Sequence, residues 1–156
     1  MKIHILAVSS RQPSWVEEGF LEFQRRMPPA CRVELIQIPL ARRGRNPDSG
    51  RAKADEGQRL LARVPEGSRI IALDERGDGW TTVKLSRRLA DWFNDGRDVA
   101  LLIGGPDGLA DICRQRAEAA WSLSSSTLPH GLVRIIVAEQ LYRAWTVLEG
   151  HPYHRA

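Results

Sequence analysis

The chain has 156 residues, a length suited to one domain, and its 42% hydrophobic and 27% charged residues are ordinary for a soluble globular protein. No apolar stretch is long enough to span a membrane, and two distant cysteines without ligand-like spacing make a disulfide framework or a metal site improbable. The net charge of +4 suits a nucleic-acid partner without requiring one. We expect a single cytoplasmic domain over residues 1–156.

Short apolar runs alternate with amphipathic helical patterns along the chain. The runs predict strands at residues 3–8, 33–38, 69–73, 99–103 and 121–124. The patterns predict helices at residues 15–27, 51–63, 82–94, 109–120 and 131–148. Because strands and helices alternate through short connections, we expect an α/β fold in which one parallel sheet carries helices on both faces.

Two polar segments interrupt this alternation. Residues 42–50 are basic and contain glycine and proline, so they predict a loop, and residues 74–79 predict a charged turn. Arg42, Arg43 and Arg45 could contact RNA phosphates, which would position a nucleic acid without reading its sequence. A solvated basic loop without a partner is the competing interpretation.

The most informative segment follows the apolar run at residues 99–103 and reads Gly104-Gly-Pro-Asp-Gly108. Glycines allow a sharp turn and let another group approach the backbone closely. Neither a G-x-x-x-x-G-K-[ST] nor a G-x-G-x-x-G pattern is present, and Asp107 would repel a phosphate. The segment alone is compatible with a tight turn that binds nothing and with one wall of a ligand site.

Two other predicted strand ends carry turn or hydroxyl residues, at Leu73-Asp74 and at residues 123–130. The carboxyl ends of parallel strands lie at one edge of a sheet, so these loops and the glycine turn could form one pocket. Backbone groups and hydroxyls there would suit an adenine and a ribose. For the serine-rich loop, the alternative is a polar segment that only caps the next helix.

Four segments together resemble one protein family: LLIGGPDG at residues 101–108, WSLSSSTLPH at 121–130, LVRIIVAEQLYRAW at 132–145 and HPYHR at 151–155. The family comprises small bacterial methyltransferases of the SPOUT class that methylate N3 of a pseudouridine in 23S rRNA. The total length also fits, and the similarity extends over nearly the whole chain.

The resemblance implies a fold that periodicity does not reveal, with a trefoil knot in its C-terminal part. It also implies S-adenosylmethionine as cofactor, 23S rRNA within the large subunit or the 70S ribosome as substrate, and a homodimer whose active site uses both subunits. Carried over position by position, the cofactor contacts are Leu73, Gly104, Gly105, Leu123, Ser124, Ser125, Ser126, Thr127 and Leu128.

Methylation of a uracil-type N3 requires loss of an imide proton, so a base or a stabilising cation must lie near the ring. The candidates are His130, Arg143 and the terminal Tyr153, His154 and Arg155. We expect Arg143 and the three terminal residues to shape the nucleotide pocket, and the base stays unassigned. The alternatives are a helix start for His130, a solvated charge for Arg143 and a frayed tail for the last residues.

Two other functions fit part of the pattern. A non-catalytic factor that docks on the ribosome would need the basic loop but not the glycine turn. A methyltransferase of the same class could act on tRNA instead. Binding of S-adenosylmethionine would exclude the docking factor, and the identity of the methylated RNA would separate the two enzymes.

Overall fold

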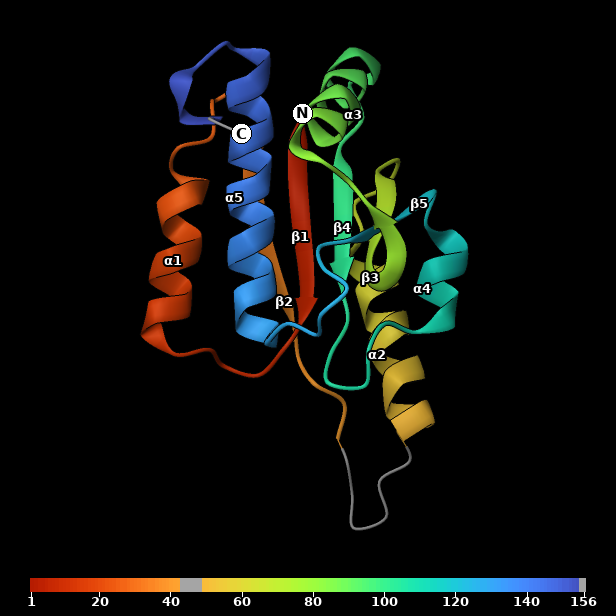
Figure 1. The fold of residues 1–156 in the computed structure, drawn as a ribbon. Helices are drawn as coiled ribbons and strands as arrows, with labels where there is room; N and C mark the ends of the chain where they lie inside the picture. Colours follow the sequence, from red (N-terminus) through yellow and green to blue (C-terminus); the bar gives the residue numbers. More distant parts are fainter. Residues whose placement is uncertain (43–48, 155–156) are drawn as a thin grey trace.

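The structure is a computed structural model that describes residues 1–42 and 49–154 (Figure 1). Most of the basic loop predicted at residues 42–50 lies outside the described residues, and so do Arg43, Arg45 and Arg155. Strands and helices alternate as the sequence predicts, and a short 3₁₀ helix, η1 (Pro152–His154), follows the last α-helix.

Five strands pair in parallel in the order β2-β1-β4-β3-β5. They are β1 (Lys2–Val8), β2 (Arg32–Ile38), β3 (Arg69–Gly79), β4 (Val99–Ile103) and β5 (Ala119–Ser122). Every residue of the central strand β4 is buried, as expected for a strand that is covered on both faces. The predicted parallel sheet is therefore confirmed.

Helices cover both faces of this sheet. Helices α1 (Ser14–Gln24), α3 (Thr82–Asp95) and α5 (His130–Leu148) lie on one face, and α2 (Ser49–Arg63) and α4 (Asp111–Arg116) lie on the other (Figure 1). Alternate residues of a strand point to opposite faces, so Ile5 packs in the core beneath α5 while Leu6 packs with Leu60 of α2. No helix in the described ranges is both long and apolar enough to cross a membrane.

The predicted charged turn at residues 74–79 is wrong, because β3 continues to Gly79. Leu73 and Asp78 both pair with Trp121 of β5, so the residues between them form a bulge in the strand. The charged side chains here are typical of a turn. Backbone pairing with β5 nevertheless extends the strand, because strand formation depends on the neighbouring strand more than on local propensity.

The predicted helix at residues 109–120 is too long, and the fifth strand begins earlier than the predicted residue 121. Helix α4 ends at Arg116, and β5 begins at Ala119. The backbone N–H of Glu118 donates to the carbonyl of Ile70, 2.9 Å away, which draws this segment toward β3. The Ala-Glu-Ala-Ala segment at residues 117–120 has high helix propensity, and sheet pairing overrides it.

Gly77 in the bulged part of β3 provides a test of the corrected strand. A Cβ added at Gly77 would lie 2.6 Å from the carbonyl carbon of Ala120 in β5, so the backbones must separate to admit it. We expect Gly77→Ala to lower the free energy of unfolding by about 1–3 kcal/mol. Urea denaturation measures this change.

Gly79→Ala is the matched control, because a Cβ at Gly79 would meet no atom within 4 Å. We expect this variant to unfold close to the unaltered protein. Equal stability of all three proteins would show that β3 and β5 do not approach each other in this way.

Candidate functional site

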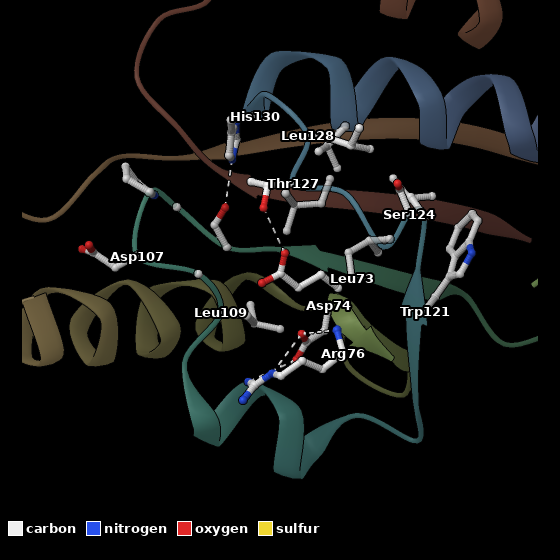
Figure 2. A pocket seen from close by; sticks show the side chains of 18 of the residues that line it. Leu73, Asp74, Arg76, Asp107, Leu109, Trp121, Ser124, Thr127, Leu128 and His130 are labelled. Carbon is white, nitrogen blue, oxygen red and sulfur yellow. Dashed lines mark hydrogen bonds and ion pairs between the residues drawn. The ribbon is translucent and has the colours of Figure 1, made fainter. Parts of the chain in front are cut away.

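A cavity of about 700 Å³ opens at the carboxyl edge of the sheet, where β4 and β5 end beside the bulge of β3 (Figure 2). The structure thus brings the three predicted strand ends together. Of the predicted cofactor contacts, all except Ser125 line this cavity: Leu73, Gly104, Gly105, Leu123, Ser124, Ser126, Thr127 and Leu128. The volume lies in the range of small-molecule sites, and the cofactor-binding role of these residues stays a prediction.

The glycine turn forms one wall and is packed against its own backbone. A Cβ added at Gly104 would lie 2.5 Å from the carbonyl carbon of Gly108 and from the backbone nitrogen of Leu109. Gly108 has a φ of +86°, which other residues rarely adopt, and its N–H donates to the carbonyl of Gly105 at 3.0 Å. The turn therefore requires glycine for steric reasons before any ligand is considered.

The loop after β5 forms the facing wall and is held by its own hydroxyls. The Ser124 hydroxyl accepts from the N–H of Ser126 at 2.9 Å, and the Ser122 hydroxyl donates to the carbonyl of Ser124 at 3.0 Å. Thr127 reaches across the cavity to Glu75 of β3, with 3.4 Å between the two oxygens (Figure 2). This loop is thereby fastened to the end of β3.

His130 begins α5 and joins the helix to the glycine turn. Its Nε2 lies 2.9 Å from the carbonyl oxygen of Gly104, so Nε2 carries the proton in this contact (Figure 2). Burial lowers the pKa of His130, and the nearby charge of Arg134 lowers it further, against the hydrogen bond to Gly104. His130 is therefore a neutral imidazole that fixes the position of the glycine turn.

The floor of the cavity contains Asp74, from the predicted strand end, and an ion pair that the sequence does not reveal. The carboxylate of Asp74 is ion-paired with Arg114 of α4 and accepts from the backbone N–H of Arg76 at 3.0 Å (Figure 2). Burial alone would raise the pKa of Asp74, but these hydrogen bonds lower it below its ordinary value. Asp74 is thus an ionised carboxylate whose charge is balanced by arginine.

Glu75, Arg76 and Arg114 also line the cavity, and none was among the predicted site residues. Glu75 and Arg76 could have been predicted as site residues from their position directly after a buried apolar run. They were not, because the segment was interpreted as a charged turn. Arg114 lies on α4, and nothing in its local sequence marks it.

The predicted catalytic residues lie away from this cavity in the same subunit. Tyr153 packs edge-on against Tyr142 of α5, with ring centroids 4.7 Å apart. Tyr142 is twelve residues beyond His130 in one helix, and a rise of 1.5 Å per residue separates the two by about 18 Å along the axis. Arg143 and His154 belong to the same remote end, so the structure groups these three with one another and not with the cavity.

Of the predicted RNA contacts, only Arg42 lies within the described residues, where it is exposed. Lys53 of α2 lines the cavity and adds a cation to it. Among the described residues, no cluster of histidine, cysteine, aspartate or glutamate is arranged to hold a metal ion.

The chain is similar to a known family over its whole length. The family model described as "Predicted SPOUT methyltransferase" matches residues 1–154. The "Ribosomal RNA large subunit methyltransferase H" of Thioalkalivibrio sulfidiphilus is 52% identical over 155 residues, covering 99% of each chain. The protein of the same name from Methylococcus capsulatus is 55% identical over 155 residues, covering 99% of this chain and 100% of the relative.

A solved structure supports the fold. The crystal structure of a methylase family protein from Neisseria gonorrhoeae superposes with a TM-score of 0.55 at 14% identity, covering 90% of this chain and 80% of the other. At this identity the likeness concerns the fold alone.

The neutral state of His130 predicts a pH dependence of stability. Its pKa is lowered from the ordinary value of 6.5 in the folded protein, so the unfolded chain binds the proton more readily. Stability therefore falls as the pH drops below the ordinary value and recovers above it. Glutamine at this position could still donate to Gly104 but could not take up a proton.

We expect the urea midpoint of His130→Gln to fall less than that of the unaltered protein between about pH 7.5 and about pH 5.5. Parallel pH profiles for the two proteins would show that His130 is not held neutral in the fold.

Proposed function

The chain belongs to the SPOUT methyltransferase family, and from this premise we propose that it transfers a methyl group from S-adenosylmethionine to 23S rRNA. The cavity between the glycine turn and the loop after β5 is the observation that carries the proposal. The full-length relatives named for methylation of large-subunit ribosomal RNA support the choice of substrate.

The residues that line the cavity fit S-adenosylmethionine. Backbone groups of the glycine turn and of residues 123–128 can hold an adenine and a ribose, and a Cβ at Gly104 would distort the turn that presents them. Glu75 and Asp107 line the same cavity and bring negative charge toward a cationic ligand. When bound, the cofactor supplies an electrophilic methyl group on a sulfonium.

The target that we propose is N3 of a pseudouridine. The imide proton of such a ring has to be lost before or during attack, and a nearby cation would stabilise the charge that develops. We assign Arg143, Tyr153, His154 and Arg155 to the nucleotide pocket. His130 holds the glycine turn and is not assigned as the base.

We further propose a homodimer in which the tail of one subunit completes the cavity of the other. Within one subunit the distance of about 18 Å along α5 separates Tyr153 from the cavity. Helix α5 carries apolar residues around its whole circumference, and Leu132 and Ile136 are only partly buried. Trp15 of α1 is 56% exposed, and we propose that it contributes to the dimer contact.

Two further parts of the proposal concern a knot in the fold and the ribosome as the place where the enzyme acts. The hydrogen bonds from Thr127 to Glu75 and from His130 to Gly104 fasten the segment after β5 to the ends of β3 and β4. We propose a trefoil knot at this edge, and this attachment would hold the threaded segment in place. We propose that the shape of the assembled ribosome in the cytoplasm selects the nucleotide.

The proposal is tested with S-adenosylmethionine labelled in its methyl group and three substrates: 70S ribosomes, free 23S rRNA and tRNA. We expect label in 23S rRNA from ribosomes, and mass spectrometry should place it on a pseudouridine base. Label in tRNA alone would favour the tRNA enzyme. No heat on calorimetric titration with S-adenosylmethionine would favour a docking factor.

Gly104→Ala should abolish the cofactor site, because the added Cβ would lie 2.5 Å from the backbone of Gly108. We expect the affinity for S-adenosylmethionine to fall at least about tenfold, measured by calorimetry. Gly79→Ala is the control and should bind normally, because Gly79 does not line the cavity. Normal binding by Gly104→Ala would place the cofactor elsewhere.

Mixed dimers test the composite site. Gly104→Ala impairs the cavity of a subunit, and Tyr153→Phe impairs its tail, so each variant alone should transfer methyl groups at a strongly reduced but measurable rate. When the two are co-refolded, a mixed dimer has one intact cavity facing one intact tail, and random pairing restores roughly a quarter of the sites. Methyl transfer that stays at the level of the separate variants would show that the tail serves its own subunit.

A further inference from the structure

The end of the chain is held against its own subunit by a specific arrangement of side chains. The guanidinium of Arg143 lies 5.2 Å from the centroid of the Tyr153 ring, and the guanidinium of Arg26, in the turn after α1, lies 5.9 Å from it. The same ring packs edge-on against Tyr142. Two cations and one aromatic ring thus fix the plane of the Tyr153 side chain.

Glu139 is the acceptor on which this arrangement converges. The hydroxyl of Tyr153 donates to Oε1 of Glu139 at 3.1 Å, and Nε of Arg143 donates to the same oxygen at 2.9 Å. The amide of Gln140 donates to the other carboxylate oxygen at 2.8 Å. The Glu139 side chain is only 16% exposed, so water would replace these bonds poorly if one partner were removed.

We propose that Glu139 is a positioning residue that sets the arrangement in which Tyr153 and Arg143 are offered to the partner's cavity. This inference rests on the proposed function, because Glu139 is assigned to position residues of the methyl-transfer site. Arg26 is the second anchor of the same arrangement and comes from the turn that follows α1. Glu139 acts through the tyrosine and the arginine and does not itself touch the reacting atoms.

The position of Glu139 separates this role from cofactor binding. It lies nine residues beyond His130 in α5, about 14 Å along the helix axis from the cavity of its own subunit. A change confined to its carboxylate should therefore leave the glycine turn and the loop after β5 intact. Turnover should respond to the change while the affinity for S-adenosylmethionine should not.

Glu139→Gln and Glu139→Ala test the proposal in the full-length protein, with ribosomes as substrate. We expect a fall in kcat of about tenfold or more for Glu139→Ala, a smaller fall for Glu139→Gln, and a dissociation constant for S-adenosylmethionine within about twofold of normal. Glu66→Gln is the matched control, because Glu66 is exposed in the connection between α2 and β3. Unchanged kcat in both variants, or lost cofactor binding in both, would overturn the proposal.

A double variant shows whether Glu139 works through the tyrosine. If it does, Glu139→Gln should slow methyl transfer in the unaltered protein and have little further effect in Tyr153→Phe. If the fall in rate of the double variant equals the product of the falls in the two single variants, this part of the proposal is overturned.

Titration of the phenol gives a measure that needs no substrate. Tyr142 and Tyr153 are the two tyrosines, so Tyr142→Phe leaves one phenol to follow by absorbance. Burial raises the pKa of Tyr153, and the charge and hydrogen bond of Glu139 raise it further. We expect Glu139→Gln in this background to move the titration toward the ordinary tyrosine value.

An unmoved titration would show that Glu139 does not hold the tyrosine, even in an active enzyme. Failure of the proposed function has a different signature, since the unaltered protein would then transfer no methyl group while the titration could still shift.

Discussion

Parallel pairing of β4 between β1 and β3 is the constraint on which the other features depend. It places the carboxyl ends of neighbouring strands at one edge, and a single cavity then collects residues that are far apart in the chain. Leu73, the glycine turn and the loop after β5 meet there although about fifty residues separate the first from the last. None of these segments forms a pocket alone, and they line one together because they meet at the same edge of the sheet.

The cavity and the C-terminal tail have different chemistry. Within the cavity, Asp74 is balanced by Arg114 and His130 is neutral, while Lys53, Glu75, Arg76 and Asp107 add charges of both signs among backbone groups, hydroxyls and apolar side chains. At the other end of α5, Arg143 and Tyr153 donate to the Glu139 carboxylate, and Arg26 and Tyr142 pack against the Tyr153 ring. The first environment suits a small ligand recognised by shape, and the second suits a polar ring whose charge changes during a reaction.

The sequence predicted the sheet, the faces of its helices and the meeting of the three strand ends because these features follow from periodicity and from the position of turns. It failed where pairing between distant segments decides the structure. The charged residues after Leu73 extend β3 because β5 lies beside them. The alanine-rich segment before Trp121 enters the sheet because Ile70 accepts its hydrogen bond.

The site residues divide in the same way, into those recognisable from the local sequence and those placed by contacts between elements. Gly104 and the serine-rich loop are recognisable from residue type and from the family resemblance. Arg114 becomes a lining residue only because α4 packs next to the bulge of β3, and Arg26 reaches Tyr153 only because the turn after α1 lies beside the C-terminal part of α5. Such contacts between elements are not encoded in any local pattern.

The length of α5 has a consequence for how this protein can vary. One continuous helix begins at the glycine turn and ends at the tail, so it fixes both the separation of these two parts and their relative rotation. Inserting one residue would turn the tail by about 100° about the axis, whereas inserting seven would nearly restore its direction while moving it about 10 Å. The length of helix α5 therefore sets both the distance and the relative rotation of the cavity and the tail. A small change of this length is more disruptive than an equal change in a surface loop.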